Sequence, residues 1–405
     1  MKRLRHFLVP AAAAIALAAM GSQAFADKMY GPGASDTEIK IGNINPYSGP
    51  ASAYGAIGKA IGAYFGKINA EGGINGRKIT YISYDDGYSP PKTVEQARRL
   101  VEQDEVLLVF QSLGTPPNTA IQKYMNQKKV PQLFVATGAT KWNDPKTYPW
   151  TMGWQPNYQT EAKIYAKYIM ENVPDAKIGV LYQNDDYGKD YLTGLRDGLG
   201  DQADKLIVKA VSYETSDATV DSQMVQLKES GANVFVNITT PKWAAQAIKK
   251  AADIGWQPLH FLNNVSNSVP SVLKPAGLDK SVGIISSAYY KSPGDAQWDN
   301  DDAMKEFNDF MAAHHKDGNP KDNFNAYGYL VAQTLVQVLK QAGDNLTREN
   351  VMKEAANLKD LELPLLLPGM KINTSPDDFA PIEEMQLEKF NGESWELFGT
   401  VISGS

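Results

Sequence analysis

The chain of 405 residues contains no cysteine, and this absence limits how the protein can be built. Its fold cannot rest on disulfide bonds, and a secretion signal at its start cannot end in a lipid-modified cysteine. The GxSxG, P-loop and HExxH patterns are absent as well. Nothing in the sequence points to an enzyme, and we expect no cofactor and no metal ion.

The first 26 residues have the three-part pattern of a secretion signal. Three basic residues lie within the first five positions, residues 7–20 are apolar, and residues 24–26 read Ala-Phe-Ala, a small-x-small cleavage motif. The apolar part is shorter than the roughly 20 residues of a membrane span, which argues against the alternative of a retained anchor. We predict cleavage after Ala26 and a soluble periplasmic protein.

The chain also lacks an excess of basic residues. Without the signal it keeps 37 Lys and Arg against 46 Asp and Glu, a formal charge of −9. Nucleic acids and anionic membranes require a concentrated basic surface, so the acidic balance argues against both as partners. The length is typical of about two domains. No later run is long and apolar enough to cross a bilayer.

Short apolar runs alternate with amphipathic segments along the whole chain. We expect strands at residues 39–43, 79–84, 106–110, 132–136, 177–182, 206–213, 233–238, 260–263 and 283–287. We expect helices at 52–70, 92–103, 118–128, 158–172, 187–199, 219–230, 242–254 and 324–341. This alternation predicts an α/β fold with doubly wound parallel sheets, and the number of strands suits two lobes.

Three stretches interrupt the alternation, near residues 147–156, 287–292 and 363–368. Proline and glycine in such stretches are typical of segments that pass between domains. We therefore predict lobe one from residues 36–154 and 288–366, and lobe two from 155–287 and 367–405. In the last segment, MKIN and MQLEKF have the pattern of strands and Asn391-Gly392 that of a tight turn.

Three loops that follow predicted strands are rich in hydroxyls and glycine: residues 45–55, 111–118 and 137–142. Ligands of doubly wound sheets bind at the carboxyl ends of the strands, so these loops are candidate binding loops. Thr115 is placed to start a helix, where free N–H groups favour an anion. The alternative is that Ser112, Thr115 and Thr140 only cap helices. Three such loops together favour a bound anion.

Four segments carry a resemblance to a known family: IKIGNINPYSGPASAYG, the GGINGRK and YDD-x-x-x-P motifs, VPQLFVATGATKW and IGVLYQNDDYGKDYLTGLRDGL. The chain resembles the periplasmic binding proteins of ATP-driven (ABC) importers for branched-chain amino acids and related compounds. The resemblance implies a clamp of two lobes and three crossovers that delivers a small molecule to a membrane permease, and we expect a monomer. It also implies a ligand carboxylate at Gly114, Thr115, Gly138 and Thr140, with Tyr54 and Tyr187 beside the ligand.

One departure from the family pattern bears on the ligand. Amino-acid binders of this family place a lobe-two glutamate against the ligand ammonium, but this sequence has Val265 and Ser266 there. An unpaired buried ammonium costs several kcal/mol, which disfavours an α-amino acid. The family's other lobe-two aromatic falls at Thr239 or Thr240.

Trp142 and Trp154 stand near the predicted cleft, and two indoles favour a flat apolar ligand such as an aromatic acid. The alternative for each is core packing. A branched-chain amino acid and a small amide remain open as ligands, as does a two-lobed sensory protein. The predicted ligand-binding set is Tyr54, Ser112, Leu113, Gly114, Thr115, Gly138, Ala139, Thr140, Trp154, Tyr187, Thr239 and Val265.

Overall fold

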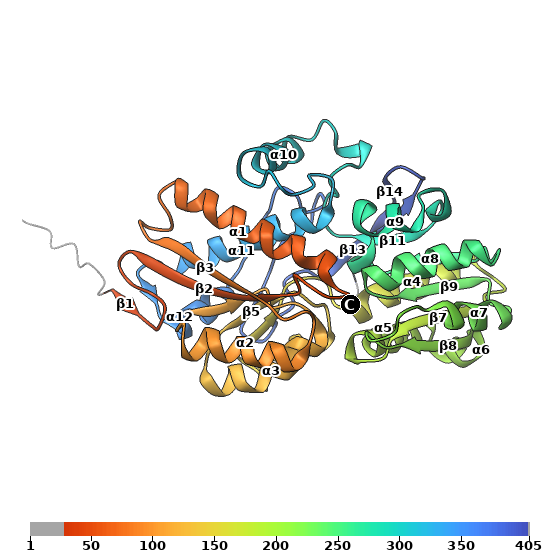
Figure 1. Ribbon diagram of the computed structural model, residues 1–405, viewed down its shortest axis with the longest axis horizontal. Coiled ribbons are helices and arrows are strands. Elements are labelled where there is room, and N and C mark those ends of the chain that lie inside the picture. The colour runs from red at the N-terminus through yellow and green to blue at the C-terminus, as the bar shows by residue number, and fades with distance from the viewer. Residues whose placement is uncertain (1–27, 404–405) are drawn as a thin grey trace, which may run out of the picture.

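The computed structural model describes residues 28–403 and divides them between two lobes that lie side by side (Figure 1). The predicted signal, residues 1–26, lies outside the described residues. Each lobe is built on one large sheet whose central strands are parallel, with helices on both faces. The predicted fold class, two doubly wound α/β lobes, is confirmed.

The sheet of lobe one has the strand order β3-β2-β4-β5-β6, and all its pairs are parallel. Its strands are β2 (Glu38–Asn45), β3 (Lys78–Asp85), β4 (Leu108–Phe110), β5 (Gln132–Val135) and β6 (Thr151–Gly153). The order reverses between β2 and β4, so the loops after these strands open at a switch point where ligands bind.

Two helix layers cover this sheet, with α1 and α11 on one face and α2 and α3 on the other (Figure 1). The helices of lobe one are α1 (Gly55–Ala70), α2 (Pro90–Glu102), α3 (Thr115–Lys128), α10 (Asp302–His314), α11 (Asn323–Ala342) and α12 (Arg348–Ala355). A small parallel pair, β1 (Met29–Tyr30) with β12 (Asn345–Leu346), lies at the far end of this lobe.

The sheet of lobe two has the order β14-β13-β11-β10-β9-β7-β8. Its parallel strands are β7 (Ile178–Gln183), β8 (Ile207–Tyr213), β9 (Val234–Ile238), β10 (Leu259–Leu262) and β11 (Ile285–Ala288). Every residue of β9 is buried, as expected for an apolar strand covered on both faces. The helices are α4 (Tyr158–Asn172), α5 (Asp186–Leu199), α6 (Ala203–Leu206), α7 (Asp221–Glu229), α8 (Pro241–Asp253) and α9 (Lys274–Ala276).

The C-terminal segment returns to lobe two as an antiparallel hairpin, β13 (Glu384–Phe390) and β14 (Trp395–Ser403). The predicted turn at Asn391-Gly392 is confirmed, because Asn391 N donates to Ser394 O at 3.1 Å and Gly392 has φ 106°. The prediction that MKIN, residues 370–373, forms a strand is wrong. This segment pairs at one position, Ile372 with Leu361, and is otherwise irregular.

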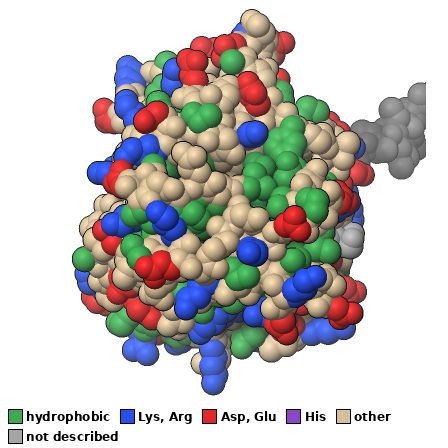
Figure 2. Space-filling model, turned by 90° about the vertical axis from the view of Figure 1, so that its right-hand side faces the viewer, with side chains coloured by type: hydrophobic (Ala, Val, Ile, Leu, Met, Phe, Trp, Pro, Cys, Tyr) green, Lys and Arg blue, Asp and Glu red, His purple; other side chains and the backbone are tan. Residues whose placement is uncertain are grey.

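One face of the described residues shows how the charged side chains are distributed. Basic and acidic side chains are interspersed over the face shown in Figure 2. Among residues 28–403, no helix has the length and apolarity needed to cross a bilayer.

Candidate functional site

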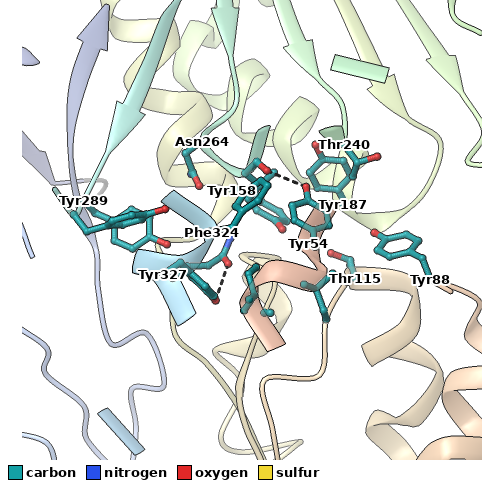
Figure 3. Close-up of a pocket in the computed structure, with 17 residues that line it drawn as sticks. Tyr54, Tyr88, Thr115, Tyr158, Tyr187, Thr240, Asn264, Tyr289, Phe324 and Tyr327 are labelled. Carbon is teal, nitrogen blue, oxygen red and sulfur yellow. Dashed lines mark hydrogen bonds between the residues drawn. The ribbon is translucent and has the colours of Figure 1, made fainter. Parts of the chain in front are cut away.

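A cavity lies between the two lobes, at the carboxyl ends of their parallel strands (Figure 3). Its lining includes seven tyrosines: Tyr54, Tyr88, Tyr158, Tyr187, Tyr289, Tyr290 and Tyr327. The other lining residues are Ile57, Leu113, Gly114, Thr115, Ala136, Gln155, Thr240, Asn264, Val265 and Phe324. Within this lining there is no Asp, Glu, Lys, Arg or His. Burial raises the pKa of Tyr158 to about 12, so its phenol is uncharged at neutral pH.

The turn from β4 into α3 forms the floor of the cavity on lobe one. Gly114 has φ 98° and precedes α3, and a Cβ there would lie 2.4 Å from a ring carbon of Tyr88. Only glycine therefore permits this turn and the close approach of the tyrosine ring. Thr115 begins the helix, and its Oγ1 forms a hydrogen bond of 2.6 Å with Thr137 Oγ1.

The structure brings six of the predicted residues to the cavity: Tyr54, Leu113, Gly114, Thr115, Tyr187 and Val265. They come from both lobes, and two of them, Tyr54 and Val265, form a hydrogen bond between the lobes. The hydroxyl of Tyr54 donates to the backbone oxygen of Val265 at 3.0 Å. The hydroxyl of Tyr187 accepts from Asn263 Nδ2, and its ring packs edge-on against Tyr158 at 5.2 Å between centroids.

The hydrogen bonds of Thr140 correct the prediction that this residue binds the ligand carboxylate. Its N–H and its Oγ1 both donate to Asp190 Oδ2, at 2.8 and 3.0 Å, so neither group is free for a ligand. Gly138 and Ala139 border a separate small pocket with Thr140. Gly138 packs against the start of α4, and its carbonyl accepts from Tyr158 N at 2.8 Å.

Ser112 and Thr239 also turn away from the cavity. Ser112 is fully buried, and its hydroxyl donates to Asn118 Oδ1. Thr239 is fully buried too, and its hydroxyl donates to Asn237 Oδ1 at 2.7 Å. Both hydroxyls satisfy buried polar groups inside their own lobe, and Thr240 takes the lining position in lobe two.

The two tryptophans pack in the core, as the alternative interpretation had it. Trp154 is fully buried, and its Nε1 donates to Thr334 Oγ1 at 3.0 Å. Its indole stands edge-on to Tyr327 and Tyr289, with centroids 5.3 and 6.1 Å apart. Trp154 therefore supports the tyrosine wall from behind, while Trp142 Nε1 donates to Thr137 Oγ1 at 3.2 Å.

Known proteins with a similar sequence identify the family of this chain. A model of the family described as "Periplasmic binding protein" matches residues 38–393. The chain belongs to the periplasmic binding protein family. Membership implies a periplasmic location, a small-molecule ligand and a membrane permease as partner.

Other proteins and solved structures that are similar to this chain agree with the family and the fold. The "Leu/Ile/Val-binding protein homolog 2" of Brucella abortus is 26% identical over 353 residues, covering 85% of this chain and 87% of the relative. A Thermus thermophilus branched-chain amino acid ABC transporter protein with bound valine has a TM-score of 0.80 at 15% identity, covering 91% and 97% of the two chains. A fatty acid ABC transporter substrate-binding protein from Thermomonospora curvata has a TM-score of 0.76 at 21% identity, covering 93% and 95%.

Polar contacts join the two lobes around the cavity in this structure. Asp322, at the start of α11 in lobe one, accepts from two lobe-two hydroxyls, Ser268 Oγ at 2.9 Å and Ser271 Oγ at 2.6 Å. The contact of Thr140 with Asp190 and that of Tyr54 with Val265 also cross between the lobes.

Eleven lining residues were missed by the sequence-based set. Tyr88 lies inside the YDD-x-x-x-P motif that carried the family resemblance, and this signal could have identified it. Tyr289 and Tyr290 follow β11 at the predicted second crossover, where a pair of adjacent aromatics is a usable signal. Thr240 was the second candidate for the position assigned to Thr239. The remaining residues have no local signal: Ile57, Ala136, Gln155, Tyr158, Asn264, Phe324 and Tyr327.

Proposed function

We propose that this protein captures a small aromatic carboxylate in the cavity between its lobes and delivers it to an ABC permease. The observation that carries the proposal is the lining itself, in which eight aromatic side chains occur and no ionisable side chain is charged at neutral pH. Flat apolar bodies pack well against tyrosine faces and edges. We infer that the lobes close on the ligand as a monomeric clamp after the signal has been cleaved behind Ala26.

The carboxylate end of the ligand is assigned to the start of α3. Thr115 offers a hydroxyl and a backbone N–H at the positive end of the helix, where anions are stabilised. Pro116 and Pro117 follow Thr115 and have no backbone N–H. In an ordinary helix start these two residues would share the anion with Thr115, so here Thr115 supplies a larger part of the anchor. Helix dipole and hydroxyl together favour a single carboxylate over a larger anion.

The lack of an acidic lining residue argues against an α-amino acid. A buried ammonium needs a carboxylate or several acceptors, and an unpaired one costs several kcal/mol. The competing ligand is nevertheless a branched-chain amino acid, because the Brucella abortus relative named above is called a Leu/Ile/Val-binding protein homolog. A small amide is the third class, since it keeps the shape of the acid and loses its charge.

A thermal-shift screen separates these ligands. Benzoate, phenylacetate and cinnamate are compared with their primary amides, with aliphatic acids of the same length, and with leucine and valine. A ligand at a hundredfold excess over its Kd stabilises the folded protein by about 2.7 kcal/mol, which gives a clear rise in Tm. We expect the largest rise with an aromatic acid. A larger rise with leucine or valine would assign the protein to the amino-acid binders.

A further inference from the structure

A carboxylate lies directly behind the lobe-two wall of the cavity, although no carboxylate lines it. Glu161, on α4, is 1% exposed. Its Oε1 accepts from Tyr165 OH at 2.5 Å and from the backbone N of Asn264 at 2.7 Å. Its Oε2 accepts from Tyr191 OH at 2.5 Å and from Asn264 Nδ2. Four donors converge on this buried group, and no cation is among them.

These bonds fix the side-chain amide of Asn264. A carboxylate oxygen that receives a second donor from Tyr191 acts as an acceptor, so the amide atom beside it must be the nitrogen. The backbone bond to Oε1 holds Asn264 and the carboxylate together, and a turned amide would set two acceptor oxygens against each other, so the amide keeps this orientation. The carbonyl oxygen, Oδ1, then points away from Glu161, and Asn264 lines the cavity on that side (Figure 3). None of the hydrogen bonds within residues 28–403 uses this oxygen.

We propose that Glu161 is a positioning residue that makes Asn264 Oδ1 a fixed hydrogen-bond acceptor for the ligand. This inference rests on the proposed function and adds to it the chemistry of a second ligand group. The aromatic carboxylate carries one uncharged donor, a hydroxyl or an N–H, on the side that faces lobe two. Thr115 in lobe one and Asn264 in lobe two then grip opposite ends of the ligand, so both bonds form fully only when the lobes are closed.

The chemistry of the acceptor explains why the donor is uncharged. One amide oxygen satisfies one hydroxyl or N–H, whereas an ammonium brings three donors and a full charge. Both oxygens of Glu161 are already occupied by two donors each, so the carboxylate is not available to that ammonium. A polar site of this kind rejects an analogue that lacks the donor, because the buried oxygen is then left unpaired.

The test uses derivatives of 3-phenylpropanoate that carry either a hydroxyl or a methyl group at each ring position and at each chain carbon. The two groups have similar size, and only the hydroxyl donates. Calorimetry gives the ratio of the methyl to the hydroxyl Kd at every position. For the unmodified protein we expect a ratio of at least about tenfold at one position. We expect Asn264→Leu and Glu161→Gln each to reduce that ratio to about one, Leu because it removes the oxygen and Gln because it lets the amide turn.

Tyr191→Phe is the matched control. It removes a donor from the same carboxylate but leaves both bonds to Asn264, so it should lower Tm while the ratio stays at its original value. A ratio that survives Glu161→Gln overturns the positioning role. Binding of the probes with no preference for hydroxyl at any position overturns the inference and leaves the proposed function intact. Failure of every probe to bind overturns the proposed function, and the inference with it.

Discussion

We expect closure of the clamp to depend on Asp322, and Asp322→Ser tests this dependence. Asp322 is 5% exposed, and its carboxylate receives the hydroxyls of Ser268 and Ser271 from the opposite lobe. It also caps α11, because its Oδ1 accepts from Phe324 N at 3.1 Å. Serine is as good a cap as aspartate, so the exchange keeps the helix start. The side chain of the introduced serine is too short to reach the hydroxyls of both Ser268 and Ser271, so this contact between the lobes is lost.

The expected loss follows from the two bonds. A hydrogen bond to a charged group contributes about 1.5–3 kcal/mol. In the open form water replaces the lost bonds at little cost, so the exchange penalises only the closed form. Taking the loss as that of a single bond at the middle of this range, about 2 kcal/mol, the Kd rises roughly thirtyfold. The change in affinity occurs without any contact between Asp322 and the ligand, because ligand binding and closure are linked.

Calorimetry with the tightest aromatic acid from the screen measures the Kd, and small-angle scattering measures the radius of gyration with and without that acid. Asp322→Asn, which retains one oxygen, should give a smaller loss of affinity than Asp322→Ser. In the serine variant, the ligand-free protein should also be more extended than the unmodified one. An unchanged Kd together with an unchanged radius would mean that these bonds persist in the open form, and the role of Asp322 as a closing contact would be refuted.

Three further predictions concern ligand binding by Thr115, the packing of Trp154 behind the cavity tyrosines, and the pH dependence of stability. Thr115→Val should weaken binding of the same acid by about 1.5–3 kcal/mol in calorimetry, and unchanged affinity would remove Thr115 from the site. Thr334→Val should lower the free energy of unfolding in urea by about 1–3 kcal/mol, because it leaves the buried Trp154 N–H without an acceptor; an unchanged midpoint would contradict this. Burial raises the pKa of Asp295 from 3.8 to about 7, so the folded state holds this proton more tightly, and its contribution to stability falls as pH rises from about 4 to 7. Asp295→Asn should therefore flatten this decline and raise the Tm at pH 8, whereas an unaltered pH profile would refute the assignment.

The regular elements were predictable because parallel strands buried on both faces are continuous apolar runs. The run at residues 233–238 became β9, and the helical spacing at 158–172 became α4. The short helix α12 was missed, because it lies between predicted elements, where the pattern is weak.

The floor of the site was predictable in part. Gly114 and Thr115 have local reasons to be there, because the turn before α3 has a positive φ that favours glycine and a helix start presents free N–H groups to a ligand. Trp154 was not predictable, because its burial depends on Thr334, which is 180 residues further along the chain. The place of Tyr327 in the cavity lining was not predictable either, since a tyrosine on a long apolar helix is indistinguishable from a core residue until its neighbours are known.

Glu161 is the most instructive of the missed residues. In an amphipathic pattern a glutamate is assigned to the exposed face, because charged side chains are almost never fully buried unless paired. Here the pairing is supplied by hydroxyls and amides from three separate segments, including Tyr165, Tyr191 and Asn264. No property of the local sequence records such a convergence.

The central claim is that the uncharged, tyrosine-lined cavity accepts an aromatic carboxylate and rejects an α-ammonium. The most direct test is a calorimetric titration of 3-phenylpropanoate against phenylalanine, which differ only in that group, with 4-methylpentanoate against leucine as the second pair. An unpaired buried ammonium costs several kcal/mol, so the acid of each pair should bind at least about a hundredfold more tightly, and 3-phenylpropanoate should bind best of the four. Tighter binding of leucine than of 3-phenylpropanoate would contradict the claim.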